Sequence, residues 1–494
     1  MMKEQSFGAS SNKVSDWQAI DWPKVRHHVR RLQLRIAKAT RAGKYGKAKA
    51  LSWLLTHSRS AKLLAVKRVT ENKGAKTPGV DNKLWRTDRQ KYAAVQNLKR
   101  RGYRPLPLRR HYIPKKNGKL RPLSIPTLRD RAMQALHALA LKPTAETIGD
   151  RNSYGFREGR SCADAIGQSF CALAKSYAPV WVLEGDIKSC FDRISHKWLL
   201  ANIPMDARIL RQWLEAGYWE KGRLFPTQEG TPQGGIISPL LANLTLDGME
   251  KALRSRIKIR RDQVNFIRYA DDFIVTARTK ETLEQIIKPA VVAFLKERGL
   301  ELSEQKTTIT HIEAGFKFLG QNVRKYNNKL VIKPAKEGLK ALVQKTRECI
   351  KGMLGQKAET LIKTLNPIIR GWANYHRHVC SSEAFWTADR IIRYQLLRWA
   401  RRTHPNKSYG WLRRKYFNLE GMFGFATRTR TSTGESKVLR AYSIARTVLD
   451  WHIKVRGEAN PYDPVYTKYF EQRRCFAWRT LPRETTGQMV LAGI

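Results

Sequence analysis

Acidic residues are scarce in this sequence: its 494 residues include 41 Asp and Glu against 94 Lys and Arg, a formal net charge of +53. An excess of this size indicates a polyanionic partner, because basic side chains release counterions from the phosphates that they contact. Long apolar runs are missing too, and without 18 consecutive apolar residues no segment is expected to span a bilayer. Aromatic residues interleave with the basic ones, so we expect a nucleic acid partner and no membrane.

Cysteine is rare and scattered, with six residues and no Cys-x-x-Cys pair. In a long chain this spacing predicts reduced thiols in a cytosol-like compartment. The first residues lack the apolar segment of a secretory signal, which agrees with that location. The cysteines are Cys162, Cys171, Cys190, Cys349, Cys380 and Cys475.

Between Trp22 and Thr70 there is no acidic residue at all. Apolar residues recur there every three or four positions, which predicts a helix with a wholly basic outer face. The alternative is an ordinary solvated helix, but such helices usually mix both signs of charge. We therefore expect this stretch to bind nucleic acid through Arg26, Arg30, Arg31, Arg35 and Lys38.

A second stretch without acids runs from Leu396 to Tyr416 and combines basic residues with aromatic ones. The combination favours stacking on unpaired bases together with phosphate contacts. The alternative is an amphipathic core helix that uses its aromatic residues for packing. The aromatic residues are Trp399, Tyr409, Trp411 and Tyr416, and the predicted nucleic-acid contacts are Arg398, Arg401, Arg402, Arg413, Arg414 and Lys415.

The stretch from Tyr269 to Asp272 reads Tyr-Ala-Asp-Asp and lies between two short apolar runs, which predicts strand, tight turn and strand. Neighbouring side chains on a strand point to opposite faces, so a turn is needed to bring both carboxylates to one point. Two carboxylates at one point repel each other unless a cation lies between them. Oxygen ligands favour Mg²⁺ or Mn²⁺, and two such ions about 4 Å apart support phosphoryl transfer. A plain Asp-rich turn is the alternative.

A third carboxylate, Asp186, ends another apolar run that begins at Val180 and predicts a buried strand. If that strand lies beside the Asp-Asp turn, the three acids converge. The segment from His111 to Pro126 predicts a hairpin around Asn117-Gly118 with basic residues on both arms. Such a hairpin suits a triphosphate, and a plain surface hairpin is the alternative.

Beyond residue 334 the apolar residues recur at helical spacing, which predicts a largely helical region. The predicted helices run from Leu339 to Leu354, Ala358 to Leu365, Ile368 to His378 and Phe385 to Arg402.

Several of these segments resemble, in the same order, those of a reverse transcriptase, and the chain as a whole resembles a group II intron-encoded reverse transcriptase/maturase. The resemblance rests on the Tyr-Ala-Asp-Asp box, on the block from Pro232 to Asn243, and on Asp186 placed five residues before Phe191. Further blocks agree at Thr77 to Asp81, Arg121 to Pro126, Tyr154 to Arg157 and Gly371 to His376.

This resemblance implies an α+β fold: a right-hand polymerase of fingers, palm and thumb with an antiparallel palm sheet, followed by a helical thumb/maturase domain and a small basic C-terminal DNA-binding region. The implied divisions are a disordered tail (1–21), the N-terminal extension and fingers (22–170), the palm (171–325), the thumb/maturase domain (326–416), and a DNA-binding region with a remnant of the endonuclease linker (417–494). No His-Asn-His core or cysteine pairs follow that linker, so we expect no endonuclease activity.

By the same resemblance, Asp186, Asp271 and Asp272 are the catalytic ligands of two Mg²⁺ ions, with Mn²⁺ as a substitute. Phe191 is the implied steric gate against a ribose 2′ hydroxyl. Lys306 is the implied proton donor to the leaving group. The residues expected to contact the nucleotide are Lys115, Arg121, Phe191, Gln233 and Tyr269.

The function implied is an RNA-directed DNA polymerase that also acts as a maturase: it binds its group II intron RNA to assist splicing and copies the intron by target-primed reverse transcription. The expected partners are intron RNA, an RNA template with a DNA primer, target DNA and deoxynucleoside triphosphates. We expect a bacterial cytoplasmic location, at the nucleoid during integration, rather than an organelle. The alternatives are a non-enzymatic splicing cofactor and another cellular, retron-like reverse transcriptase, which the Gly371 to Tyr375 block disfavours.

Overall fold

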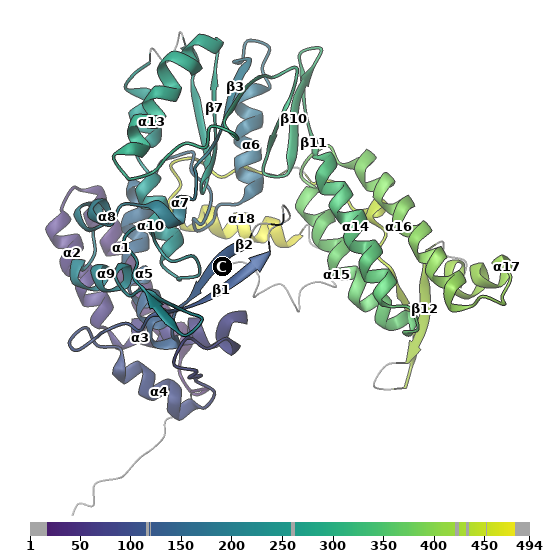
Figure 1. Cartoon of the computed structure of the whole chain (residues 1–494), viewed down its shortest axis with the longest axis horizontal. Coiled ribbons are helices and arrows are strands. Elements are labelled where there is room, and N and C mark those ends of the chain that lie inside the picture. Colours follow the sequence, from purple (N-terminus) through teal and green to yellow (C-terminus); the bar gives the residue numbers. More distant parts are fainter. Residues whose placement is uncertain are drawn as a thin grey trace, which may run out of the picture.

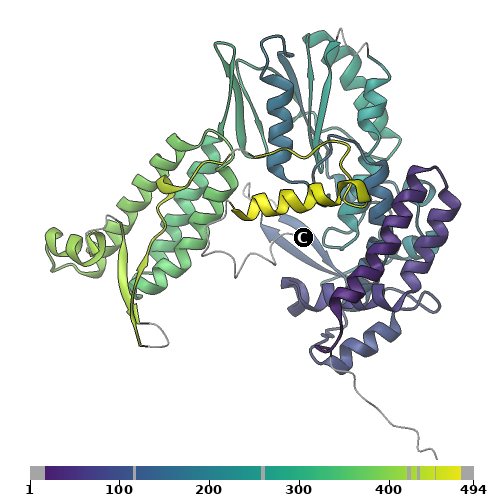
Figure 2. The ribbon, with the colours of Figure 1, turned by 180° about the vertical axis from the view of Figure 1, so that it is seen from behind.

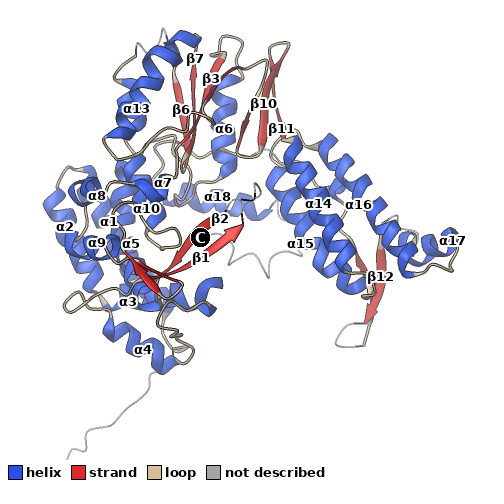
Figure 3. Ribbon diagram, viewed as in Figure 1, coloured by secondary structure: helices blue, strands red, loops and turns tan. Residues whose placement is uncertain are grey.

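The computed structural model describes residues 17–114, 118, 120–257, 262–419, 424–430, 434–450 and 452–479. They form an N-terminal helical region, a central sheet with its covering helices, and a helical domain set to one side (Figures 1 and 3). Among the described residues no helix combines the length and the apolar character needed to cross a membrane. Helices and sheets mix along the chain and most strand pairs are antiparallel, so the expected α+β fold is confirmed.

The N-terminal region packs from Trp17 onward, whose ring is buried and meets Trp22 edge-on, with ring centroids 5.2 Å apart. Packed structure therefore starts inside the stretch that we predict to be a tail, and residues 1–16 lie outside the described part. Helix α1 (Trp22–Arg41) begins where the Asp21 carboxylate accepts a hydrogen bond from the Lys24 N–H. It packs with α2 (Tyr45–His57) and α3 (Arg59–Thr70) on the long helix α5 (Leu128–Ile148).

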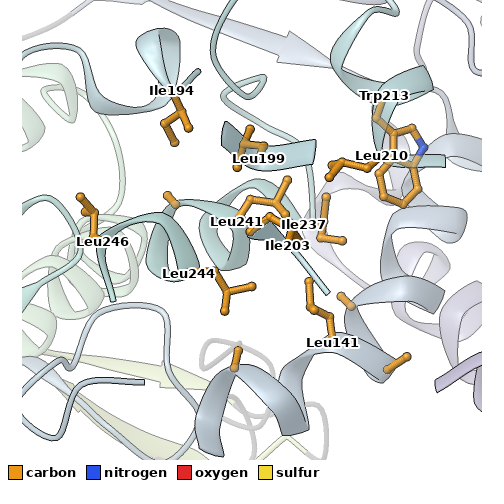
Figure 4. Close-up of a cluster of buried hydrophobic side chains, with 14 of the residues drawn as sticks. Leu141, Ile194, Leu199, Ile203, Leu210, Trp213, Ile237, Leu241, Leu244 and Leu246 are labelled. Carbon is orange, nitrogen blue, oxygen red and sulfur yellow. The ribbon is translucent and has the colours of Figure 1, made fainter. Parts of the chain in front are cut away.

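A basic hairpin, β1 (Leu108–Pro114) and β2 (Leu120–Ile125), forms as predicted and reaches toward the middle of the molecule (Figure 1). Strands β4 (Tyr218–Glu220) and β5 (Arg223–Phe225) extend it into a sheet of order β2-β1-β4-β5. The short helices of this region are α4 (Asp88–Asn97), α7 (Cys190–Arg193), α8 (His196–Asn202), α9 (Ala207–Leu214), α10 (Ser238–Leu246) and α11 (Met249–Arg254). Figure 4 shows the apolar core between these helices and α5, with Leu141, Ile203, Leu210, Trp213, Ile237 and Leu241 among the labelled residues.

The central sheet has the order β6-β7-β3-β8 and is antiparallel throughout. Its strands are β6 (Asn265–Tyr269), β7 (Asp272–Ala277), β3 (Trp181–Asp186) and β8 (Thr308–His311). Helix α6 (Cys162–Leu173) packs on β6, and η2 (Thr282–Ile287), which leads into α13 (Lys288–Lys296), packs on β7 and β3. Strand β7 is buried along nearly its whole length, which fits the apolar run that predicts it.

A three-stranded sheet of β9 (Phe316–Phe318), β10 (Gln321–Tyr326) and β11 (Lys329–Pro334) leads into the helical domain, residues 336–417. Its main helices are α14 (Lys336–Gly352), α15 (Ala358–His376) and α16 (Ser382–Thr403), followed by α17 (Tyr409–Leu412) and η3 (Arg413–Phe417). Helix α15 is continuous through Pro367, so the prediction of two helices here is wrong. Pro367 is exposed, and water can therefore satisfy the carbonyl that loses its intrahelical donor.

The chain then forms the hairpin β12 (Ala426–Arg430) and β13 (Ser436–Arg440) and the turn η5 (Ile444–Arg446), and returns to the rest of the molecule. We call residues 450 and 452–479 the strap; they contain η6 (Pro464–Tyr466) and end in α18 (Thr467–Arg479). Figure 2 shows α18 lying across the molecule between the helical domain and the N-terminal region. Asp463 in the strap forms an ion pair with Arg41 on α1 at 2.7 Å.

One buried carboxylate on α6, Asp164, holds the strap in place. Its Oδ1 accepts hydrogen bonds from His452 Nε2 at 2.8 Å, from the Val455 N–H at 2.6 Å and from Arg473 at 3.0 Å. Burial by itself raises the pKa of Asp164, but these partners outweigh it and lower that pKa to about 2. The ionised carboxylate therefore stabilises the docked strap.

We expect Asp164→Asn to destabilise the docked strap by about 2 kcal/mol at pH 7. The folded-state pKa lies below the ordinary value of 3.8, so this stabilisation is present above about pH 4 and is lost as the pH falls through 2. Proteolysis within the strap measures the effect, with the exposed Glu281→Gln as the matched control. Equal cleavage rates in Asp164→Asn and the parent at pH 7 would contradict it.

Candidate active site

The three predicted catalytic acids meet at one end of the central sheet. Asp186 ends β3 and lies directly opposite Asp272, the first residue of the neighbouring strand β7. Asp271 lies in the turn between β6 and β7, after Ala270, whose φ of 57° is left-handed. All three acids line one cavity of about 1240 Å³. The sequence prediction that acids far apart in the chain converge is confirmed in this respect.

Burial and mutual repulsion both act on these carboxylates. Burial raises the pKa of Asp272 to about 6, and the neighbouring Asp271 and Asp186 add to the rise. Burial also raises the pKa of Asp271, again with a contribution from Asp186. Charges of one sign are thus held close together in a partly dry site, an arrangement that a cation stabilises.

Lys306 is the cation that Asp186 binds in this structure, with its Nζ 2.8 Å from Asp186 Oδ2. This hydrogen bond raises the pKa of Lys306, so the lysine keeps its proton at neutral pH. Within the described residues no three His, Cys, Asp or Glu side chains are already gathered around a single point as a metal site requires. Oxygen atoms from three carboxylates nevertheless suit hard divalent ions, and the Lys306 side chain that pairs with Asp186 is itself 67% exposed.

Arg268, which is fully buried, stabilises the turn that carries Asp271. Its guanidinium donates hydrogen bonds to Asp247 at 2.5 Å, to Asn243 at 3.1 Å and to the Ala270 carbonyl at 3.2 Å. Our sequence interpretation missed this residue. The available signal was a single arginine inside an apolar strand, where a charged side chain needs a buried partner.

A second element, the loop around Gly155, closes on the same turn. The Tyr154 N–H donates to the Arg268 carbonyl at 2.9 Å, and the Asn243 side chain donates to the Gly155 carbonyl at 2.7 Å. A Cβ at Gly155 would collide with the backbone of Ala270. The Tyr154 to Arg157 block therefore supports the turn that carries Asp271.

Three of the predicted nucleotide contacts line the same cavity: Arg121, Phe191 and Gln233. Arg121 extends from β2, and the Phe191 ring meets Phe156 edge-on with centroids 6.3 Å apart. Gln233 donates to Asp192 at 3.1 Å. Lys115 lies outside the described residues.

Tyr269 is placed differently from the prediction. It pairs with Asp272 across the β6–β7 ladder, but its side chain lies against Cys162, as does that of Tyr375 from α15. It does not line the cavity. The structure therefore does not bring Tyr269 to the other predicted nucleotide contacts. Its ring and that of Tyr375 meet at Cys162 and so link β6 to the helical domain.

On α1 the predicted nucleic-acid residues Arg26, Arg31, Arg35 and Lys38 are exposed. Arg30 is an exception, because its guanidinium lies 4.8 Å from the Tyr462 ring centre and donates to the Pro461 carbonyl. It is used to hold the strap, and the prediction that it contacts nucleic acid is not supported.

In the second basic stretch Arg398, Arg401, Arg402, Arg413, Arg414 and Lys415 are all exposed. Trp399 and Tyr416 are buried in the core of the helical domain, so the prediction that they stack on bases is wrong. Leu396, Trp399 and Ala400 share one helical face, and that spacing favours the packing alternative. Tyr409 remains exposed.

In a comparison with known proteins, three protein families match separate parts of this chain. "Reverse transcriptase (RNA-dependent DNA polymerase)" matches residues 113–323, "N-terminal domain of reverse transcriptase" matches 17–98, and "Group II intron, maturase-specific domain" matches 339–417. The first match contains the cavity and its three carboxylates, and the third covers α14 through η3.

Two relatives are similar over about half of this chain. Protein YkfC of Escherichia coli (strain K12) is 36% identical over 299 residues, which are 52% of this chain and 78% of the relative. Group II intron-encoded protein LtrA of Lactococcus lactis subsp. cremoris is 31% identical over 329 residues, 53% of this chain and 54% of LtrA. Among solved structures, apo telomerase from Candida tropicalis aligns at 15% identity over 62% of each chain, with a TM-score of 0.39.

Proposed function

The chain belongs to the group II intron reverse transcriptases and maturases, and from that premise we propose that it copies RNA into DNA at Asp186, Asp271 and Asp272 and binds a group II intron RNA to assist splicing. The observation that carries the polymerase proposal is the pairing of β3 with β7, which sets Asp186 opposite Asp272 in the lining of one cavity. The maturase-specific match over residues 339–417 favours this reading over a retron-like enzyme.

Reverse transcriptases depend on divalent metal, and we propose Mg²⁺, two ions held by Asp186, Asp271 and Asp272. Bound there, the ions supply activation of the primer 3′ hydroxyl and charge stabilisation for the pyrophosphate. Lys306 neutralises the charge of Asp186 through an ion pair of 2.8 Å. We assign to Lys306 the donation of a proton to the leaving pyrophosphate.

The other cavity residues bind and select the deoxynucleoside triphosphate. Arg121 lines the cavity on β2 and neutralises phosphate charge, and Phe191 and Gln233 contact the sugar and base region. The exposed basic residues of α1 and of the helical domain bind the RNA template and intron RNA. In mobility, target DNA provides the 3′ end that is extended.

The test is extension of a DNA primer on an RNA template by the purified protein, with Mg²⁺ and then Mn²⁺ titrated against a chelator. We expect product only when a divalent ion is present. Splicing of an intron transcript, with and without protein at low Mg²⁺, tests the maturase activity separately. Splicing without any extension under either ion would favour the non-enzymatic cofactor.

We expect Phe191→Ala to admit ribonucleotides. The ring lies in the cavity beside Phe156, and removing it leaves room for a 2′ hydroxyl. Discrimination against ribonucleotides, measured as the ratio of kcat/KM values, should fall by about 10–200-fold, the range for a change in one apolar contact. Phe170→Ala is the control, since its ring is also exposed (44%) but does not line the cavity. An unchanged ratio in Phe191→Ala would remove the gate assignment.

A further inference from the structure

Helix α16 carries a row of exposed side chains at four-residue intervals that the polymerase site does not use. Two of them are aromatic and three are basic, and we call them the ladder: Trp386, Arg390, Tyr394, Arg398 and Arg402. Residues four apart lie on neighbouring turns, each about 40° further around the helix, so the row spirals gradually along α16. The two rings are about 12 Å apart along the axis with a guanidinium between them.

The ladder is not part of the domain core. The opposite face of α16 is buried against α14 and η5 through Phe385, Ile392, Leu396 and Trp399. The ladder rings are by contrast 67% exposed at Trp386 and 62% at Tyr394. Large aromatic rings left in water on a rigid helix indicate a contact surface.

The charge of the ladder is also uncompensated. Within the described part of the chain none of its five side chains has a hydrogen bond, ion pair or ring contact. The acids nearest in sequence are engaged elsewhere: Glu383 pairs with Lys333 at 3.0 Å, and Asp389 accepts from the Ala445 N–H. Three guanidinium groups and two rings therefore face solvent together.

Near the C-terminal end of the ladder a third exposed ring, Tyr409, is 50% exposed and lies 5.7 Å from the guanidinium of Arg401, the residue next to Arg402. Figure 1 shows α16 extending away from the central sheet toward α17. The surface is therefore separate from the cavity that holds the three carboxylates.

From this arrangement we propose that the ladder binds an unpaired stretch of RNA, with Trp386 and Tyr394 stacking on bases and the arginines between them contacting phosphates. In a duplex the faces of the bases are stacked on one another, so exposed aromatic rings add no binding energy. Every unpaired base, by contrast, offers a face on which a ring can stack. An acidic protein surface would use the arginines and leave the rings unexplained. The inference rests on the proposed intron-RNA binding and names the part of the RNA that the helical domain reads: a loop or single strand.

The test measures binding of a fluorescent, unstructured 20-residue RNA to protein already loaded with a primer–template duplex, so that the polymerase cavity is filled. We expect Trp386→Ala/Tyr394→Ala to weaken this binding about 10-fold or more and to leave binding of an RNA duplex of equal length unchanged. Tyr177→Ala is the control, since that ring is also 67% exposed but lies outside the helical domain. Arg390→Ala/Arg398→Ala should weaken binding of both the single strand and the duplex. For the single strand, the slope of log K against log salt concentration should become shallower by about 0.7 per arginine.

Melting curves and primer extension separate this inference from the proposed function. The aromatic double variant Trp386→Ala/Tyr394→Ala should have the parent's melting temperature and extend a short primer at the parent rate. Parent-like binding of the single strand by the aromatic double variant would overturn the inference, as would an equal loss for single strand and duplex. If the parent protein did not extend a primer at all, the proposed polymerase activity would be refuted, while the binding result for the ladder would still hold.

Discussion

Asp271→Asn is expected to reduce primer extension by about 10³-fold or more, equivalent to about 4 kcal/mol of transition-state stabilisation. The substitution keeps the size of the side chain and removes one negative charge from a turn that is fixed by the β6–β7 ladder. Without that charge the site holds divalent ions more weakly. Single-turnover extension on an RNA template, at several Mg²⁺ concentrations, measures the loss.

The same substitution should not destabilise the protein. Burial and Asp186 raise the pKa of Asp271, so its ionised form is disfavoured in the metal-free fold. The Asp271→Asn variant should therefore have a melting temperature equal to that of the parent or higher. Glu304→Gln is the control, because Glu304 lines the same cavity but is exposed and outside the carboxylate group. Parent-like extension by Asp271→Asn would refute the mechanism.

Arg268→Met is expected to impair both folding and catalysis. It leaves the buried Asp247 carboxylate without its ion-pair partner, which costs about 3–5 kcal/mol of stability. It also removes the hydrogen bond to the Ala270 carbonyl that fixes the catalytic turn. A shift of the turn by about 1 Å is enough to slow the reaction about 100-fold.

A double variant separates the two effects. Arg268→Met/Asp247→Leu leaves no lone charge in the interior, so stability should return toward that of the parent while extension stays low. Lys280→Met is the control: it breaks an exposed pair with Glu284 and should cost less than about 1 kcal/mol. Recovery of extension together with stability in the double variant would mean that Arg268 serves folding alone.

The sequence was sufficient where local pattern decides structure. The β6–β7 hairpin, the strand that delivers Asp186 and the β1–β2 hairpin all follow from apolar runs broken by turn residues. Their mutual pairing is a long-range property, and it was the resemblance to a family that placed the three acids together. The α14 and α16 helices follow from apolar spacing alone.

What could not be predicted depends on contacts between distant segments. Arg30 looks like any other basic residue of α1 until the strap, more than 400 positions later, covers it. Tyr269 faces Cys162 because α6 packs on β6, which no local pattern records. The ladder is different: its four-residue repeat was visible in the sequence, but the burial of Trp399 had to be known before the exposed face could be identified.

The strap has a mechanical consequence. Because the chain enters the helical domain after β11 and leaves it again at Asp450, where Arg377 forms a 2.8 Å ion pair, the domain is attached at two places. A domain held by two connections has less rotational freedom than a domain held by one. We expect these two connections to restrict how far the helical domain can move relative to the central sheet.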